Sequence, residues 1–297
     1  MRASLARCFE RLRFDARWYL RSRQPGGATW LRSGKTKSGY VLSFPAIADF
    51  LVDRTGREVV CRNASRDVSL DTIRHLLIDQ VLPLIINLRG GEALHATAVA
   101  TPEGVCAFTG PAGSGKSTLA ASFVLSGYPL VCDDCLTLAG GRTVMALAGY
   151  PGLRLWEDSI QGLGAASRRR KRRTNHATKS RWRNRVGAID FCPTPRPLVR
   201  VYLLKRTRRN AAGVMIRDLA PGRALMGLLE AAYRLDTTDR AMLKRQFHFL
   251  TGIAERVGVK QLIVPDSFSA LAAVRQLVRD DLADDRGSVS TTAKTRD

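Results

Sequence analysis

Apolar side chains in the first third of the chain occur in short runs separated by glycine-containing turns. Residues 40–44 and 59–61 have the β-branched and aromatic bias of strands. A different period follows at 69–84, where Ile73, Leu76, Leu77, Val81 and Leu84 recur at helical spacing. The pattern predicts a small, mostly β N-terminal region over 26–85 that ends in an amphipathic helix.

From residue 94 the apolar runs alternate with helical patterns. Residues 94–100, 104–109 and 128–132 are predicted to be buried strands, and a helix is predicted at 117–126. Strands are further predicted at 198–204 and 260–264, and helices from Arg223, at 239–257 and at 267–282. Such alternation is typical of an α/β domain. We therefore expect a mixed sheet flanked by helices over 86–283.

Both ends of the chain and one internal segment fall outside this alternation. Residues 1–25 are arginine-rich and are interpreted as a basic N-terminal helix or a frayed end, and 284–297 as a disordered tail. The segment 162–185 carries ten basic residues. Because like charges at this density resist compaction, we predict an exposed loop or a disordered excursion there.

Charge is the compositional outlier of this 297-residue chain. Forty-eight Lys and Arg residues against 26 Asp and Glu give a formal net charge of +22, which favours acidic partners or polyanions. No apolar run reaches the roughly 18–20 residues needed to cross a bilayer, and no secretory signal is visible. We expect a cytoplasmic protein without a membrane partner.

The six cysteines, including the pair Cys132 and Cys135, are expected to be reduced core residues, because no second pair or suitably spaced histidines complete a zinc site.

The stretch from Gly110 to Ser117 fits the pattern G-x-x-x-x-G-K-S at every fixed position. Glycines let the backbone curl so that N–H groups point at phosphate oxygens, and a helix N-terminus lies beneath the same anion. Lys116 would reach the β- and γ-phosphates of ATP, and the Ser117 hydroxyl would ligate Mg²⁺. The predicted nucleotide contacts are Gly110, Pro111, Ala112, Gly113, Ser114, Gly115, Lys116, Ser117 and Thr118.

Two further motifs flank this loop. Asp133 and Asp134 follow the apolar run 128–132, and open α/β sheets collect ligands at the carboxyl ends of strands. One carboxylate could serve the metal while the other accepts a proton from an attacking hydroxyl, or both could serve Mg²⁺. His95 lies in the strand predicted just before the loop. A lone histidine in an apolar strand is usually a core residue, but this position favours a role in the site.

Taken together, 94–99, 110–117 and 127–134 resemble the catalytic domain of HPr kinase/phosphorylase and its relatives. His95 and Lys116 are 21 positions apart, and Lys116 and Asp134 are 18 apart, which fits the family. The resemblance covers about 80–160 and implies a P-loop kinase of the phosphoenolpyruvate-carboxykinase-like fold that forms homo-oligomers. It also implies ATP as the donor, Asp134 as the general base toward a serine hydroxyl and His95 as an assisting catalytic residue. Lys116 would then be the phosphate clamp, and Mg²⁺ would lie at Ser117 and Asp133.

The chain also departs from the family. The signature Glu-x-Arg-Gly-Leu-Gly after the aspartates is absent, and Glu157 or Asp158 is the candidate replacement for its metal-binding glutamate. Thr118 stands where the bifunctional enzymes have glutamate. We therefore expect a kinase without the reverse activity, acting on a protein or peptide acceptor other than HPr.

Two other classes of function stay open. One is a binding module that uses ATP to control association and transfers no phosphate. The other is a polyanion-binding protein that uses 168–185, although Trp182 is the only aromatic residue in this run, which is little for base stacking. The same run could instead be a solvated loop or could contact an acidic acceptor.

Overall fold

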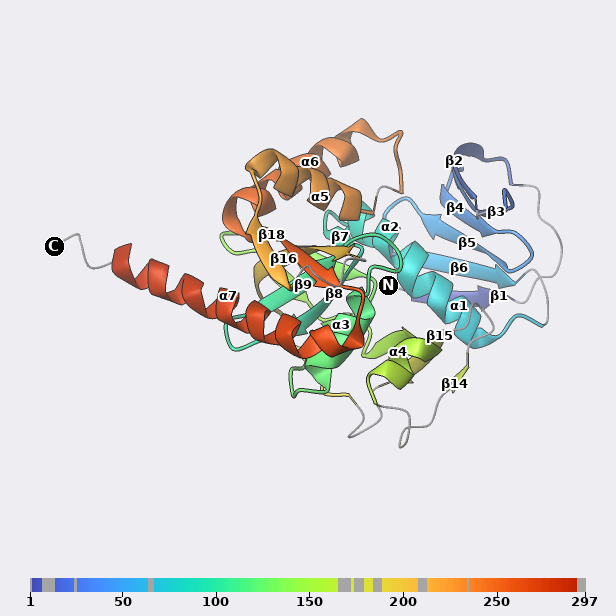
Figure 1. Ribbon diagram of the computed structural model, residues 1–297. Coiled ribbons are helices and arrows are strands. Elements are labelled where there is room, and N and C mark those ends of the chain that lie inside the picture. Colours follow the sequence, from blue (N-terminus) through green and yellow to red (C-terminus); the bar gives the residue numbers. More distant parts are fainter. Residues whose placement is uncertain are drawn as a thin grey trace. The chain divides into compact units, whose positions relative to one another are not determined.

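The structure is a computed structural model, and it describes residues 2–6, 14–23, 26–63, 67–164, 172–173, 179–183, 189–207, 213–233 and 235–292. These residues form two compact units (Figure 1). Unit 1 comprises Met1–Ala93 and Ala232–Phe249, and unit 2 comprises Leu94–Arg173, Thr178–Ala231 and Leu250–Asp297.

Unit 1 is built on a six-stranded sheet with the order β1-β6-β5-β4-β3-β2. All neighbours are antiparallel except β1 and β6, which are parallel. The strands are β1 (Arg2–Ala6), β2 (Arg17–Arg23), β3 (Thr29–Lys35), β4 (Gly39–Phe44), β5 (Ala48–Asp53) and β6 (Glu58–Asn63). The four strands after residue 26 confirm the predicted β region. The N-terminal segment was wrongly expected to be helical or frayed: β1 and β2 are strands, because pairing with β6 and β3 satisfies their backbone hydrogen bonds despite the arginines.

A helical segment follows the sheet, as the apolar spacing predicts. It consists of α1 (Leu70–Leu76), a π-helical turn (Leu77–Val81) and α2 (Leu82–Leu88). The Ser69 hydroxyl accepts a hydrogen bond from the Thr72 N–H at 3.1 Å and caps the first turn. The helices bury Ile73, Leu76 and Leu84 in one core with Phe44 and Phe50 of the sheet.

Unit 2 contains a mixed sheet in which β9, β16 and β18 are parallel to one another. The other pairs in this sheet are antiparallel. β8 pairs with β9 and with β10, and β17 pairs with β18. β12 pairs with β16 and with β11. The strands are β8 (Ala96–Ala100), β9 (Val105–Thr109), β10 (Leu130–Cys132), β11 (Leu136–Ala139), β12 (Met145–Leu147), β16 (Arg196–Thr207), β17 (Met215–Asp218) and β18 (Gly258–Pro265). The predicted mixed α/β class is confirmed.

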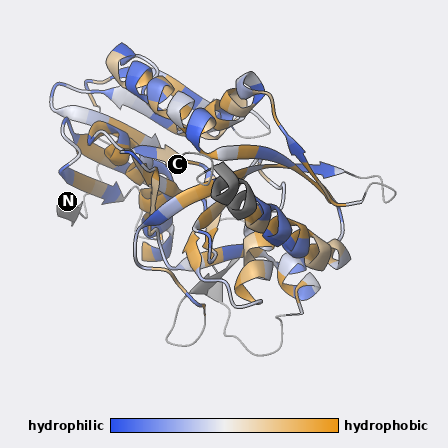
Figure 2. Ribbon diagram, turned by 90° about the vertical axis from the view of Figure 1, so that its left-hand side faces the viewer, coloured by the Kyte–Doolittle hydropathy of each residue, from blue (hydrophilic) through white to orange (hydrophobic). Residues whose placement is uncertain are grey.

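Helices flank this sheet, and α3 packs against α7. The core between helices and sheet contains Phe108, Phe123, Tyr202 and Val274. The described part of α7 carries both hydrophilic and hydrophobic residues (Figure 2). The remaining elements are β7 (Glu92–Leu94), α3 (Lys116–Val124), α4 (Glu157–Gly162), α5 (Pro221–Ala231), α6 (Arg240–Arg256), a 3-10 turn (Phe268–Ala270) and α7 (Leu271–Thr292). Within the described part of the chain, no helix has the length and apolarity to cross a membrane.

Three expectations need correction in unit 2. The run 94–100 is not one strand, because the chain bends at His95 between β7 and β8. The predicted tail at 284–297 is helical as far as Thr292, since extending a packed helix costs far less than nucleating one; 293–297 lie outside the described residues. The basic segment 162–185 is not a loop throughout: β15 (Lys179–Arg183) pairs with β13 (Gly152–Trp156) and with β14 (Arg172–Arg173).

A buried ion cluster ties α7 to the sheet. Asp281 of α7 accepts hydrogen bonds from the Tyr202 hydroxyl and the Lys260 ammonium, both at 2.7 Å. Its carboxylate also lies 3.1 Å from Nε of Arg200, a residue only 2% exposed. The guanidinium fits because position 258 has no side chain: a Cβ there would lie 1.8 Å from Nη1 of Arg200.

We expect Gly258→Ala to lower the free energy of unfolding by about 1–3 kcal/mol, because the methyl group displaces Arg200 from Asp281. The measurement is urea unfolding followed by circular dichroism. Gly222→Ala is the matched control, since its Cβ meets nothing within 4 Å. Equal stability of the parent and Gly258→Ala would contradict the packing argument.

Unit 1 has its own buried carboxylate. Asp236 lies 2.7 Å from the Lys35 ammonium and accepts hydrogen bonds from the Tyr40 hydroxyl and from the N–H and hydroxyl of Thr238. Burial alone would raise the pKa of this carboxyl, but the bonds from Lys35 and Thr238 outweigh it and hold the pKa below its usual value.

A lowered folded-state pKa stabilises the protein above the unfolded-state pKa of about 3.9, and this stabilisation is lost as the pH falls through the folded-state value. Asp236→Asn should therefore lower the unfolding free energy near pH 7 by about 1.5–3 kcal/mol, and the difference from the parent should shrink below about pH 4. Urea unfolding of both proteins across this pH range measures it. A difference that does not change with pH would show that the charge of Asp236 contributes nothing.

Candidate functional site

The three sequence motifs meet at one edge of the sheet in unit 2. β8 runs antiparallel to β9, so that Ala96 lies opposite Thr109, and the Thr109 hydroxyl donates to the His95 carbonyl at 2.9 Å. β10 in turn runs antiparallel to β8. The start of β8 therefore lies beside the carboxyl ends of β9 and β10, where the loop 110–115 and the two aspartates follow.

The loop after β9 has the backbone that the glycine pattern predicts. Gly110, Gly113 and Gly115 have φ values of 149°, 78° and 93°, a region that residues with a Cβ rarely adopt. At Gly110 a Cβ would also lie 3.0 Å from the Leu204 carbonyl oxygen. α3 begins at Lys116 immediately after the loop. The strand, loop and helix therefore follow one another in the arrangement that exposes backbone N–H groups and a helix N-terminus to an anion.

Two cationic side chains contact the carbonyl side of this loop. Lys116, only 6% exposed, donates from Nζ to the carbonyls of Gly110 at 2.8 Å and Pro111 at 3.3 Å. Arg206, at the carboxyl end of β16, donates from Nη1 to the Gly113 carbonyl at 2.9 Å and forms an ion pair with Asp266. Lys116 is where the motif predicts it. Arg206 was not predicted from the sequence, because its proximity arises from the parallel pairing of β16 with β9.

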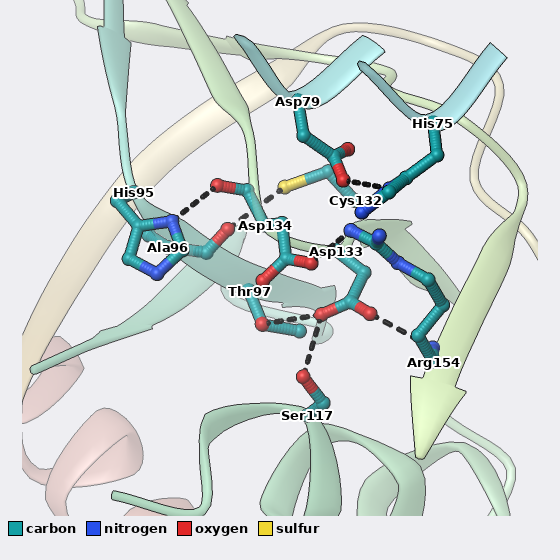
Figure 3. Close-up of polar contacts among 10 residues, drawn as sticks. All are labelled: His75, Asp79, His95, Ala96, Thr97, Ser117, Cys132, Asp133, Asp134 and Arg154. Carbon is teal, nitrogen blue, oxygen red and sulfur yellow. Dashed lines mark hydrogen bonds and ion pairs between the residues drawn. The ribbon is translucent and has the colours of Figure 1, made fainter. Parts of the chain in front are cut away.

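Asp133 is the centre of the hydrogen bonding in the site (Figure 3). Its Oδ1 accepts from the Thr97 hydroxyl at 2.8 Å and from the Ser117 hydroxyl at 2.9 Å. Its Oδ2 accepts from the Arg154 backbone N–H at 2.9 Å. One carboxylate thus connects β8, the first turn of α3 and β13.

The same carboxylate is only 8% exposed. Burial and the neighbouring charge of Asp134 raise the pKa of Asp133 to about 6, against the opposing effects of Arg154 and the Thr97 hydroxyl. A buried carboxylate whose charge is incompletely neutralised favours a cation beside it. With the Ser117 hydroxyl it offers two oxygen ligands, which suffice for Mg²⁺ because this ion keeps waters and phosphate oxygens in its coordination shell.

Asp134 has a different environment from its neighbour. It adopts a left-handed backbone with φ of 64°, which aspartate tolerates better than most residues. Its side chain forms an ion pair with the guanidinium of Arg154 (Figure 3). Asp133 thus accepts from two hydroxyls and the Arg154 backbone N–H, whereas Asp134 pairs with the Arg154 guanidinium, a difference that favours separate roles. The alternation in 153–155, an arginine between two fully buried leucines, is the sequence signal that could have identified Arg154.

The His95 side chain contacts the backbone of Asp134. Its Nδ1 lies 3.1 Å from the Asp134 carbonyl oxygen. Because a carbonyl only accepts, Nδ1 carries the proton, and Nε2 is the basic nitrogen of the neutral ring. The bend at His95, whose N–H donates to the Ala231 carbonyl at 2.7 Å, places the imidazole at the edge of the sheet.

Three further predicted residues belong to α3 and α4. The Thr118 hydroxyl hydrogen-bonds the Ser159 hydroxyl of α4 at 3.0 Å. Glu157 and Asp158 form the first turn of α4, and Asp158 is exposed. Cys132 and Cys135 are buried, and the described residues contain no cluster of three or more His, Cys, Asp or Glu side chains that could hold a metal.

Comparisons with known proteins give a distant likeness in fold. No protein-family model matches the chain, and no curated protein matches it significantly. Among solved structures, it is similar to the Hpr(Ser) kinase/phosphatase from Coxiella burnetii, with a TM-score of 0.39 and 13% identity over 69% of this chain and 99% of that chain. Similarity at this level is a likeness in fold at most.

Proposed function

We propose that the chain is an ATP-dependent kinase that transfers the γ-phosphoryl group to a serine hydroxyl on a protein or peptide. The observation that carries this proposal is the placement of Asp133 and Asp134: one is bonded to Ser117 of the phosphate-binding pattern, and the other is held by Arg154. A simple nucleotide-binding site needs only the first carboxylate. A second one, paired with the Arg154 guanidinium, would supply a proton acceptor.

Nucleotide binding would use the groups already positioned around the loop. The N–H groups of 110–115 and the N-terminus of α3 would bind the phosphates, and Lys116 would exchange its carbonyl partners for phosphate oxygens. Ser117 and Asp133 would hold Mg²⁺, which when bound neutralises charge on the β- and γ-phosphates. Arg206, bonded to Gly113, would keep the loop in its binding conformation.

The transfer step requires a proton acceptor for the attacking alcohol. The Asp134 carboxylate would take the proton of the serine hydroxyl as its oxygen bonds to the γ-phosphorus, and the bond from that phosphorus to the β,γ-bridging oxygen would break to release ADP. Arg154 would orient Asp134 through the ion pair. His95, through Nδ1 and the Asp134 carbonyl, would fix the backbone of the base.

Lys116→Ala should weaken MgATP binding by about tenfold to a hundredfold, because a charge-assisted bond to phosphate is lost. Calorimetric titration with MgATP measures the affinity. Lys205→Ala, which removes an exposed lysine from β16, is the control and should bind as the parent does. If Lys116→Ala binds as tightly as the parent, the nucleotide lies elsewhere.

Asp134→Asn should reduce phosphate transfer by about a hundredfold or more while nucleotide affinity stays within about twofold, because the amide keeps the shape of the side chain but cannot accept the proton. The assay uses γ-labelled ATP and a pool of serine-containing peptides. Asp280→Asn, on the exposed side of α7, should leave transfer unchanged. Nucleotide binding by the parent without any labelled peptide would favour the ATP-controlled binding module instead.

A further inference from the structure

An arginine reaches the phosphate-binding loop from the side opposite the two aspartates. β9, which leads into the loop, pairs with β8 on the aspartate side and with β16 on the other. Leu203 of β16 lies opposite Thr109, the last residue of β9. β16 therefore continues beyond the point where the loop begins. Arg206 lies in this continuation, and its Nη1 donates to the Gly113 carbonyl at 2.9 Å.

The pleat of β16 determines which face of the sheet Arg206 occupies. Alternate residues of a strand belong to the same face, and Tyr202 and Leu204 pack in the core that contains Phe123 of α3. Arg206 is the next residue of this series, whereas Lys205 belongs to the opposite face. Arg206 therefore lies at the carboxyl edge of the sheet, on the face that α3 covers.

A second nitrogen of the same guanidinium is held by Asp266. Nη2 of Arg206 forms an ion pair with the Asp266 carboxylate. The backbone fixes the position of this aspartate, because Asp266 directly follows β18 and its N–H donates to the Thr207 carbonyl at 3.1 Å. One guanidinium thus connects a carbonyl of the loop with a carboxylate at the end of a neighbouring strand.

The ion pair is the bond that Arg206 can exchange most readily. The side chains of Arg206 and Asp266 are 43% and 49% exposed, and exposed ion pairs contribute little to stability because water competes for both charges. The loop is open at the same place, since among the described residues nothing lies within 4 Å of a Cβ built at Gly113. A phosphate group beside the loop could therefore replace the Asp266 carboxylate, and its bond to a guanidinium is strong.

We infer that Arg206 binds the γ-phosphate of ATP: Nη1 stays on the Gly113 carbonyl, while Nη2 exchanges the Asp266 carboxylate for a γ-phosphate oxygen. The inference rests on the proposed kinase function. Backbone N–H groups of such a loop hold the α- and β-phosphates, which leaves the γ-phosphate to side chains. Lys116 is one cation bonded to this loop, and Arg206 is the second.

This exchange would make the site distinguish ATP from ADP and would assist the transfer. ADP offers no γ-phosphate to Nη2, so Arg206 would stay on Asp266. With ATP, the guanidinium would neutralise charge on the phosphoryl group as its bond to the β,γ-bridging oxygen breaks. Asp134 and Arg206 would then act from opposite sides of the loop, the first on the proton of the acceptor hydroxyl and the second on the phosphoryl oxygens.

Calorimetric titration of the full chain with MgATP and with MgADP tests the contact. Arg206→Ala should weaken binding of MgATP by about tenfold or more and keep the affinity for MgADP within about threefold of the parent, because only ATP carries the γ-phosphate. Lys205→Ala, the neighbour on the opposite face, is the matched control and should bind both nucleotides as the parent does. If Arg206→Ala leaves the ratio of the two affinities unchanged, Arg206 only supports the loop, and the inference is overturned.

Asp266→Asn tests the exchange, and its expected effect has the opposite sign. Asparagine keeps the shape of the side chain but holds the guanidinium without a charge, so Nη2 is released to the phosphate. The affinity for MgATP relative to MgADP should rise by about twofold to fivefold, the size expected from the loss of an exposed ion pair. Asp280→Asn on α7 is the control and should leave this ratio unchanged. A ratio that stays the same or falls in Asp266→Asn overturns the exchange.

Kinetics separate this inference from the proposed function. In the phosphate-transfer assay Arg206→Ala should lower kcat by about a hundredfold or more, because an arginine at the transferring phosphoryl group has effects of this size. If the parent binds MgATP but transfers no phosphate, the proposed function fails, and the ratio of nucleotide affinities still decides whether Arg206 contacts the γ-phosphate. If the parent transfers phosphate and Arg206→Ala does so equally fast, the inference alone fails. If the parent binds no MgATP, both fail.

Discussion

The buried carboxylate of Asp133 is the constraint on which the rest of the site depends. A charged group that is 8% exposed is stable only when hydrogen bonds or a cation compensate for the lost water. Thr97, Ser117 and the Arg154 N–H supply these bonds from three segments that are distant in sequence. Each segment is therefore fixed relative to the other two, and the loop 110–115 is held between them.

This arrangement also accounts for the unusual conformation of Asp134. Asp133 turns inward to its three donors, and the next residue adopts a left-handed backbone. Such a conformation costs about 1 kcal/mol or more for a residue other than glycine. Bonds from His95 and Arg154 to Asp134 help to offset this cost. The same turn places the two carboxylates against different groups: Asp133 against two hydroxyls and a backbone N–H, and Asp134 against the Arg154 guanidinium.

The sequence predicts the local elements of the site but not the contacts between them. The glycines at 110, 113 and 115 require a particular backbone, so the loop could be placed from residue type alone. The two aspartates could be placed at the end of a strand for a similar reason. Arg206 could not, because it reaches the site through the pairing of β16 with β9. The Leu-Arg-Leu alternation at 153–155 indicates a strand with Arg154 on one face, but it does not indicate that this strand lies beside the aspartates. The prediction of a loop over 162–185 was wrong for a similar reason. It considered the repulsion among like charges but not the backbone hydrogen bonds that β15 forms with β13.

The distribution of charge suggests why the basic residues are placed where they are. Two adjacent carboxylates repel an anion, so a site that is to bind the phosphates of ATP, as proposed, needs cations beside it. Lys116 and Arg206 both donate to carbonyls of the loop 110–115, and the Arg154 guanidinium pairs with Asp134. The loop cations would thus face the phosphates, while Arg154 offsets the charge of the second aspartate. An anionic group that drew the guanidinium partly away from Asp134 would raise the pKa of this carboxyl and make Asp134 a stronger base.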